Sequence, residues 1–382
     1  MLILKNGRIF DGINKEGKKL DICIEQTKIC KIESHIELEG ATVIDCTGLD
    51  IYPGFIDAHA HLGLDGYGIG FERADYNEMG DIISSELRAI DAINPRDPTL
   101  KQAALAGVTC VGTGPGSANV LGGTFVAIKT VGRRIDDMIV KNPVAMKCAF
   151  GENPKRCYRD NGNSSRMSTA AKLRETLYKA KEYLAKKEAA GDDVFKMPAF
   201  NLKLESLIPV LKKEIPLKAH AHTADDLFTA IRIAKEFDVL LTLEHCTEGH
   251  LIADELVAEN YPMAVGPSLG HASKFELKDK SWTTPGLLAN LGGHVSIITD
   301  SPVIPQQYLP LCAGMAIDAG MDPFLALQAI TINPAKHLGI DSRVGSIEVG
   351  KDADIVVLKG SPFDLHHDVK YVLIDGKIVT EE

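Results

Sequence analysis

The two ends of the chain share a pattern of short apolar runs separated by polar or glycine-containing turns. These runs, all rich in Ile, Val and Leu, cover residues 2–10, 21–32, 41–47, 353–360 and 370–379. They are typical of short strands, and Asp375-Gly376 in the last run is a hairpin signal. Because chain ends often lie near each other, we expect residues 1–50 and 345–382 to form one small β-sandwich domain.

The middle of the chain, residues 51–344, alternates short apolar runs with segments of helical periodicity. The strand candidates cover residues 54–61, 107–114, 143–150, 216–222, 240–245, 261–268 and 294–300. Two helices between them have marked ends. Ser168 or Thr169 is expected to cap one that stops at Gly191, and Thr223 to cap the other. Alternating strands and helices favour a parallel sheet covered by helices.

The seven strand candidates fit a (β/α)₈ TIM-type barrel better than a doubly wound sheet, and no G-x-G-x-x-G motif follows the first strand. We therefore predict an α/β fold with residues 51–344 as the barrel. The fourth strand is expected within residues 192–204, although Pro198 interrupts the apolar run there. The glycine-rich residues 112–123 lack a G-K-[ST] ending and are expected to form a loop that shapes the pocket.

Composition narrows the class of protein. The 382 residues are 45% hydrophobic with a formal net charge of −10, so a nucleic-acid binder is not expected. The eight cysteines include no C-x-x-C pair, which argues against a disulfide framework and suits a reducing cytoplasm. Neither a secretory signal nor an apolar run of membrane length is present. We expect a cytoplasmic protein with a small-molecule substrate and leave open whether it forms a homo-oligomer.

The ends of the barrel strands carry the candidate chemistry, because active sites of such barrels lie at the C-terminal ends of the strands. In IYPGFIDAHAH, residues 51–61, the two histidines are separated by one alanine, so both side chains point the same way. In all, five strands end in side chains that can bind a metal: His59 and His61, Glu152, His220 and His222, His245, and Asp300. This set predicts one shared metal site.

Taken in order, these motifs resemble the amidohydrolase superfamily, and most of all its imidazolonepropionase-related and dipeptidase-related branch. The matching segments are PGFIDAHAHLG, the histidine after the fifth strand, LEHC, ITDSP and the closing VGSIEVGKDADIVVL. They span nearly the whole chain. The resemblance implies a barrel flanked by a sandwich built from both termini, in agreement with the apolar pattern.

The resemblance also implies roles for single residues. His59 and His61 match the family's first-strand metal ligands. His220 matches the fifth-strand ligand, with His222 as an alternative ligand or a substrate contact. The histidine at 245 matches the sixth-strand residue that binds a second metal or hydrogen-bonds the substrate. Asp300 matches the eighth-strand aspartate, a metal ligand or its close neighbour that also shuttles protons.

Whether the site holds one metal or two depends on a bridging group. Many members with two metals use a carboxylated lysine on the fourth strand, for which Lys196 and Lys203 are the candidates in the expected segment. Glu152 is the alternative, because it shares the parity of Cys148 and faces inward if the strand stays regular. Lys147 has the opposite parity and is interpreted as structural.

The ligand set predicts metal-dependent hydrolysis of a C–N bond. Imidazole and carboxylate ligands suit Zn²⁺, and iron, manganese or cobalt accept similar donors. A bound metal lowers the pKa of water from about 15.7 toward ~7. Asp300 is expected to take the proton of this water and pass it to the leaving nitrogen, while the metal or His245 polarises the oxygen that gains charge. Dipeptides, N-acyl amino acids and cyclic amides are the expected substrates.

Substrate contacts and competing functions stay open at this point. Arg156 and Arg159 could hold a substrate carboxylate, and His222 and His271 could reach the site from the ends of the fifth and seventh strands. The competing functions are an aminohydrolase that deaminates a heterocycle and a non-catalytic scaffold of the same fold. Every ligand position is filled, which argues against a scaffold.

Overall fold

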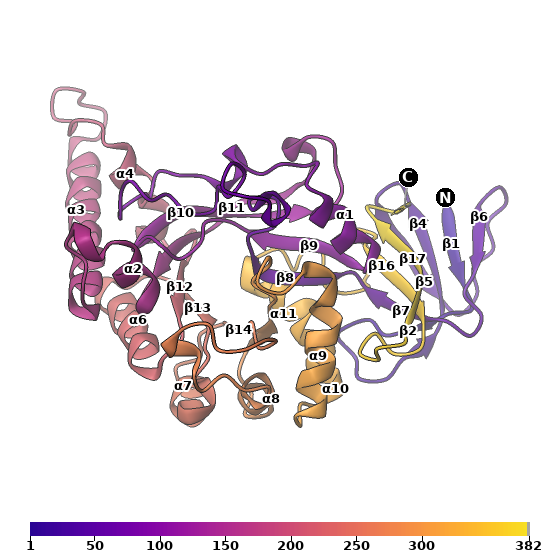
Figure 1. Ribbon diagram of the computed structural model, residues 1–382. Coiled ribbons are helices and arrows are strands. Elements are labelled where there is room, and N and C mark those ends of the chain that lie inside the picture. Colours follow the sequence, from indigo (N-terminus) through magenta and orange to yellow (C-terminus); the bar gives the residue numbers. More distant parts are fainter. Residues whose placement is uncertain (380–382) are drawn as a thin grey trace.

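The computed structural model describes residues 1–379 and contains three β-sheets. A nearly closed eight-stranded sheet forms the middle of the molecule, and two smaller sheets beside it contain both chain ends (Figure 1). The fold is therefore the predicted α/β barrel with a small β-sandwich domain built from both termini.

The sandwich joins the first residues of the chain to the last strands. One sheet has four strands in the order β5-β4-β1-β6, and the other has six in the order β18-β17-β16-β7-β2-β3. The bounds are β1 (Leu2–Lys5), β2 (Arg8–Ile9), β3 (Lys18–Lys19), β4 (Asp21–Glu25), β5 (Lys28–Glu33), β6 (Thr42–Asp45), β7 (Asp50–Pro53), β16 (Ile355–Lys359), β17 (Asp368–Ile374) and β18 (Lys377–Ile378). Apolar side chains from both chain ends, among them Leu4, Ile22 and Val357, pack in one core. The sandwich includes β7 and so extends slightly beyond residue 50.

The barrel strands follow each other around the sheet in chain order. Their bounds are β8 (Phe55–Ala60), β9 (Val108–Thr113), β10 (Leu121–Lys129), β11 (Ile139–Ala149), β12 (Leu217–Ala221), β13 (Leu241–His245), β14 (Met263–Val265) and β15 (Val295–Ile297). Strands β11 to β15 pair in parallel, as do β8 and β9. The backbone N–H of His61 donates to the carbonyl of Ser301 at 2.7 Å, which brings the first and last strands together.

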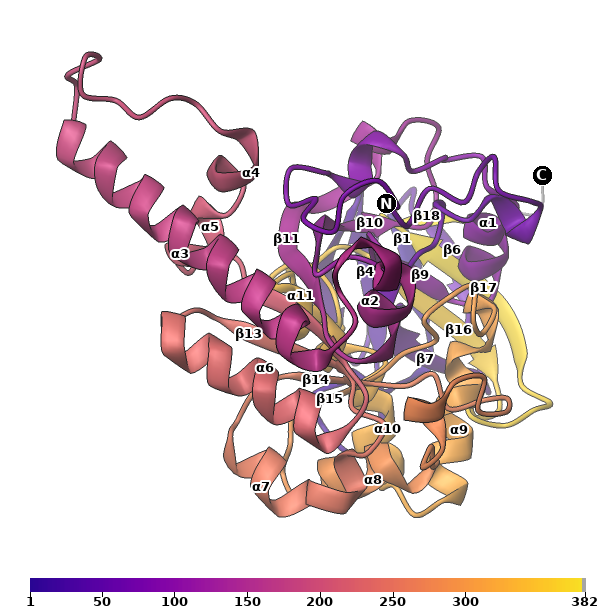
Figure 2. The ribbon, with the colours of Figure 1, turned by 60° about the vertical axis from the view of Figure 1, so that its left-hand side comes forward.

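Helices cover the outside and the ends of the barrel (Figures 1 and 2). The α-helices are α1 (Pro98–Leu105), α2 (Glu152–Cys157), α3 (Arg166–Ala190), α4 (Leu202–Glu205), α5 (Ile208–Leu211), α6 (Ala224–Phe237), α7 (Ala253–Ala258), α8 (Thr283–Asn290), α9 (Leu309–Asp318), α10 (Pro323–Ala329) and α11 (Ile332–Leu338). Short 3₁₀ helices are η1 (Gly66–Gly68), η2 (Ala89–Asp91), η3 (Ile135–Asp137), η4 (Arg159–Asn161), η5 (Gly249–Ile252), η6 (Phe275–Leu277) and η7 (Gln306–Tyr308). Within residues 1–379, none of the helices combines the length and apolar character needed to cross a bilayer.

The two helices with marked ends form close to where the sequence predicts them. Gly191 ends α3 as predicted, but the helix begins earlier, because Ser165 and Ser168 form a capping box at its start. The second helix, α6, begins directly after Thr223 as predicted. Figure 2 shows that α3 extends beyond the barrel as an arm.

The third and fourth barrel strands differ from the expectation. β10 runs antiparallel to both β9 and β11, and no α-helix lies between these three strands. The fourth strand is thus β11, which the apolar pattern ranks third, and residues 192–204 contain a loop and the start of α4 rather than a strand. Glycines made β10 resemble a loop. At Gly123, φ is +111°, and a Cβ would lie 2.4 Å from the carbonyl oxygen of Leu87.

A buried ion cluster joins the barrel to the sandwich. The Nζ of Lys129, at the end of β10, lies 2.6 Å from Asp354 Oδ2, 3.1 Å from Asp352 Oδ2 and 3.2 Å from Asp375 Oδ1. Burial alone would lower the pKa of Lys129, but Asp354 and its neighbours raise it. The two parts of the molecule are therefore held together by charge as well as by apolar contact.

Candidate metal centre and active site

Five of the six predicted metal ligands meet at the C-terminal mouth of the barrel, and His222 joins them. These five are His59, His61, His220, His245 and Asp300. The potential ligand atoms of the described residues fall into two groups, and within each group they lie within 4.8 Å of one another. His220, His222 and His245 form one group, and His59, His245 and Asp300 form the other. The geometry therefore has room for one cation or two.

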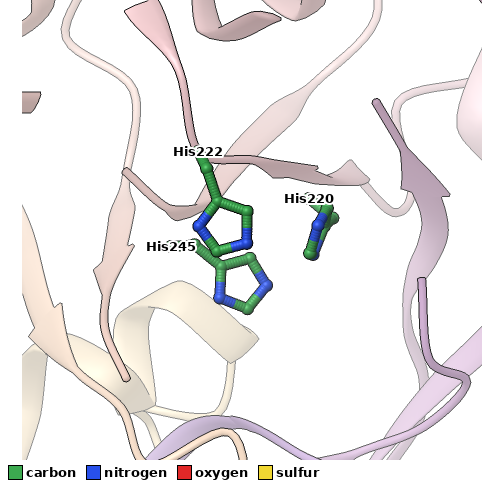
Figure 3. Close-up of side chains that lie close together, drawn as sticks. All are labelled: His220, His222 and His245. Carbon is green, nitrogen blue, oxygen red and sulfur yellow. The ribbon is translucent and has the colours of Figure 1, made fainter. Parts of the chain in front are cut away.

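The first group consists of His220 on β12, His222 directly after β12 and His245 on β13 (Figure 3). The rings of His222 and His245 are stacked with centroids 4.6 Å apart, and His220 lies edge-on to them at 4.6 and 4.3 Å. Both ring nitrogens of His220 are buried without a hydrogen-bond partner, as is Nε2 of His245. Buried polar atoms are rarely left unpaired, so these nitrogens fit a bound cation.

Beside the second group, His61 and Asp300 bring two hydrogen-bond acceptors face to face. Nδ1 of His61 lies 2.7 Å from the carbonyl oxygen of Gly114, which can only accept, so Nδ1 carries the proton and Nε2 a lone pair. This Nε2 lies 3.2 Å from Oδ1 of Asp300. Two acceptors at that distance repel each other unless a proton or a cation lies between them, and imidazole with carboxylate is a common zinc ligand set.

The other two histidines of this region are oriented in the same way. His59 Nδ1 lies 2.8 Å from Glu244 Oε2, and His245 Nδ1 lies 2.8 Å from the carbonyl oxygen of Gly266. In each neutral ring Nε2 therefore carries the lone pair, and that of His59 lies 2.8 Å from Lys147 Nζ. Metal-binding histidines typically donate the other ring N–H to an acceptor, which holds the ring in its orientation.

The protonation states also suit a metal. Burial lowers the pKa of His245 to about 4, and burial holds the pKa values of His59 and His220 well below the usual value, so all three are neutral at neutral pH. Burial alone would raise the pKa of Asp300, but His245 and His61 hold it well below its usual range. Neutral imidazoles and an ionised carboxylate are the forms that bind metals.

His245 and Asp300 share an unusual backbone conformation. Their φ angles are +76° and +53°, in the left-handed region that residues other than glycine rarely adopt. Such strain is concentrated at functional sites, where the surrounding structure holds it in place. It occurs here at the ends of the sixth and eighth strands, at the two residues to which the sequence assigns catalytic roles.

Lys147 is a site residue that the sequence analysis missed. It is fully buried on β11, its Nζ lies 2.8 Å from His59 Nε2, and burial lowers its pKa to about 7. The expected parity of β11 was wrong, because Lys147 reaches His59 while its neighbours Met146 and Cys148 pack together in the large apolar core. The available signal was the lysine itself, since a lysine within an apolar strand is rarely buried without a partner.

Glu152 does not reach the histidines, which corrects its expected role as a ligand. β11 ends at Ala149, and Gly151, with φ +78°, turns the chain so that Glu152 begins α2. Its side chain is partly exposed, and its backbone N–H donates to Glu276 Oε2 at 2.8 Å. Because β11 ends before residue 152, the alternation of side chains along the strand does not determine the direction of Glu152.

Glu276 approaches the first group instead. Its Oε1 lies 3.7 Å from His222 Nε2 and 3.8 Å from His220 Nε2, and it forms an ion pair with Lys274 at 2.6 Å. The approach depends on Gly151, because a Cβ there would lie 2.5 Å from Glu276 Oε2. Sequence reasoning missed Glu276 because it lies on the short 3₁₀ helix η6 after β14, where no strand pattern marks it.

A cavity of about 360 Å³ opens above the two groups. Its lining combines metal-competent side chains (His61, His220, His222, Asp300), polar ones (Asn77, Ser117, Asn153, Arg156, Ser273, Lys274), apolar ones (Tyr76, Pro267, Leu277, Pro302, Val303) and Gly116. Gly116 and Ser117 belong to the glycine-rich segment, which shapes the cavity as predicted. Arg156 lines the cavity, whereas Arg159 and His271 are exposed and lie outside its lining.

Comparison with known proteins points to one family. Residues 51–379 match the family model described as Amidohydrolase family. A solved amidohydrolase from Thermotoga maritima MSB8 is 40% identical with a TM-score of 0.96, and the match covers 100% of both chains.

Two further relatives are more distant. Amidohydrolase tasK from Hapsidospora irregularis is 28% identical over 386 residues, and the match covers 93% of this chain but 39% of that protein. The chain thus spans well under half the length of this curated relative. A solved Xaa-Pro dipeptidase with bound methionine in its active site is 18% identical with a TM-score of 0.58, over 99% of each chain. At that identity the likeness shows the fold alone.

Proposed function

This chain belongs to the amidohydrolase family and is an enzyme that acts on carbon–nitrogen bonds, and from this premise we propose that it uses a bound divalent metal to hydrolyse an amide-like bond of a small substrate at the mouth of the barrel. The observation that carries the proposal is the pair of acceptors, His61 Nε2 and Asp300 Oδ1, which lie 3.2 Å apart. A shared cation is the partner that suits both atoms.

We divide the candidate ligands between two cations. His59, His61 and Asp300 would hold one cation. His220 and His245 would hold a second, with His222 beside them as a further ligand or a substrate contact. Zinc suits imidazole and carboxylate donors, and iron, manganese or cobalt could take its place.

Lys147 is our candidate for the group that bridges two cations. The superfamily that the sequence resembles often carries a carboxylated lysine on the fourth strand, and β11 is the fourth strand of this barrel. A pKa of about 7 provides neutral amine at physiological pH. This amine can attack carbon dioxide: an N–C bond forms, the nitrogen releases one proton, and a carbamate anion results.

The side chains then divide the work of hydrolysis. A divalent cation, when bound, acidifies water and polarises a carbonyl oxygen. The Asp300 carboxylate accepts at an Oδ atom the proton that water loses as it attacks the carbonyl carbon. The same oxygen returns this proton to the leaving nitrogen as the C–N bond breaks, and a carboxylic acid and an amine are released. Nε2 of His245 belongs to both groups, so it is available to a cation or to the substrate oxygen.

The cavity walls favour a substrate with a carboxylate group. Arg156 lines the cavity, and no ion pair of its guanidinium is found within residues 1–379. A guanidinium binds a carboxylate through two parallel hydrogen bonds. A dipeptide or an N-acyl amino acid therefore fits best, and cyclic amides form a further class to test.

The decisive experiment combines metal analysis with a substrate panel. We expect the purified protein to bind one or two divalent cations per chain and to release a carboxylate from at least one dipeptide, N-acyl amino acid or cyclic amide. Release of ammonia from a heterocycle would instead identify an aminohydrolase. A protein that binds no cation and cleaves no member of the panel would refute the proposal.

A matched pair of variants tests the carboxylate contact. Arg156→Met should raise KM for a carboxylate-bearing substrate about tenfold or more, since a charge-assisted hydrogen bond contributes roughly 1.5–3 kcal/mol. Arg159→Met removes the same charge outside the cavity lining and should leave KM unchanged. An equal effect of both variants would contradict a specific contact.

A further inference from the structure

A polar cluster inside the barrel contacts the first-strand histidine from behind. Glu244, on β13, is fully buried, and its Oε2 lies 2.8 Å from His59 Nδ1 and 2.7 Å from Lys218 Nζ. Its Oε1 accepts a hydrogen bond from the Thr242 hydroxyl at 2.7 Å and lies 2.9 Å from His337 Nε2. All four partners are buried as well. The carboxylate is therefore held from four directions.

The partners come from separate parts of the barrel. His59 lies on β8, and His337 lies on α11. Lys218 lies on β12, which pairs with β13 so that Lys218 faces Thr242 and His220 faces Glu244. Glu244 thus links the first, fifth and sixth strands and α11 inside the barrel.

Stability alone does not explain such a cluster. Branched apolar side chains usually fill barrel interiors, and replacing a buried ion pair by well-packed apolar residues is often neutral or stabilising. Lys218 balances the charge of Glu244, because a lone buried carboxylate would be costly. The contact that leads from the cluster to the candidate metal centre is the hydrogen bond from His59 Nδ1 to Glu244.

We infer that Glu244 is a positioning residue that fixes His59 for metal binding, and that Lys218 is present to balance its charge. The inference rests on the proposed function, in which His59 Nε2 binds a cation. By accepting a hydrogen bond from Nδ1–H, Glu244 determines which ring nitrogen has the lone pair, holds the ring in one orientation and makes Nε2 a stronger electron-pair donor to a metal.

The test removes the acceptor without leaving a buried charge. In the double variant Glu244→Met/Lys218→Met both charges are lost, so the barrel should fold, but His59 Nδ1 has no acceptor. In Glu244→Gln/Lys218→Met the charges are also lost, yet the amide oxygen can still accept a hydrogen bond from Nδ1–H. Lys129→Met/Asp354→Asn is the control, since it removes a buried ion pair at the barrel–sandwich junction.

The readouts are the zinc affinity of each folded protein, measured by competition with a chromophoric chelator, and the visible spectrum of its cobalt form. We expect Glu244→Met/Lys218→Met to lose about 10- to 100-fold in zinc affinity and to show an altered cobalt spectrum. The glutamine variant should recover most of the loss, and the junction control should match the wild type.

The outcomes separate this inference from the proposed function. Wild-type zinc affinity in Glu244→Met/Lys218→Met would overturn the positioning role while leaving the metal centre intact. A wild-type protein that binds no cation would instead overturn the proposed function and the inference with it. If the methionine variant does not fold, Glu244→Asp takes its place, because it keeps the charge but shortens the reach to His59. Unchanged affinity in that variant would overturn the inference equally.

Discussion

At the scale of single residues, the site separates ring nitrogens that carry a proton from those that carry a lone pair. The carbonyl oxygens of Gly114 and Gly266 accept hydrogen bonds from the Nδ1–H groups of His61 and His245. Because a backbone carbonyl cannot donate, these contacts fix the tautomer of each neutral ring. The Nε2 lone pairs are therefore organised by the fold before a ligand arrives, which reduces the cost of binding one.

The first prediction at this scale concerns Asp300. Asp300→Asn should lower kcat about 10²- to 10⁴-fold, because an amide oxygen cannot take and return a proton as a carboxylate does. His59 and His61 remain, so the variant should fold and retain part of its metal. Kinetics and metal content of the same preparation check this. As a control, Asp160→Asn changes an exposed carboxylate outside the cavity lining and should be neutral. Undiminished turnover by Asp300→Asn would refute the proton-shuttle role.

The second prediction concerns Lys147. Lys147→Ala should lose metal and turnover together, because the bridging carbamate cannot form. Short carboxylic acids such as acetate or propionate should restore part of both, since the space left by the side chain can admit a free carboxylate. Metal content per chain and kcat, each with and without added acid, provide the measurement. Full activity in the variant without added acid would show that Lys147 is only structural.

The residues that sequence reasoning found and missed differ in a physical way. Histidines and the aspartate at strand ends were predictable because they follow apolar runs that mark the strands. Lys147 was missed because Met146 and Cys148 were taken to face the site, whereas it is Lys147 that reaches His59. Glu276 and Glu244 were missed because their contacts depend on a loop path and on strand register. Neither a loop path nor the register between two strands can be predicted from a local sequence pattern.

At the scale of elements, the same limit applies to the third and fourth strands. Eight strands were predicted in number, but the start of β10, up to Gly123, was assigned to a glycine-rich loop, and the rest of β10 was not identified as a strand. All nine residues of β10 are buried, and glycine is needed there because Leu87 packs directly against the strand. Glycine is favoured both in a turn and where two segments far apart in the sequence pack closely. Composition could therefore not distinguish the two.

The prediction at this scale compares two glycines. Gly123→Ala should destabilise the protein by about 1–3 kcal/mol more than Gly40→Ala, because the added methyl group would overlap the backbone at Leu87. Both glycines have positive φ, +111° and +77°, but nothing lies within 4 Å of a Cβ at Gly40. The difference therefore isolates the contact from the backbone strain. Urea unfolding of both variants measures it, and equal destabilisation would show that the close approach is unimportant.

At the scale of the whole molecule, the division into sandwich and barrel was predictable from the apolar pattern of the two chain ends. Their short strands pack in one core. The connection between the two parts was not predictable, since Lys129 lies in a strand that the apolar pattern did not identify and its carboxylate partners follow more than two hundred residues later. Ion pairs between such distant residues leave no local signature.

The arrangement of the site in the whole molecule leads to the last prediction. The candidate ligands come from separate strands of a barrel that has its own extensive apolar core, so the fold should not depend on a metal. We expect chelation to abolish activity while the far-ultraviolet circular dichroism spectrum stays native-like. The melting temperature should fall only partly, because metal present at 100 times its Kd contributes about 2.7 kcal/mol. Adding zinc back should restore both activity and melting temperature. Complete unfolding on chelation would instead show that the cation is part of the structure, as in small zinc domains whose ligands cannot be assembled without it.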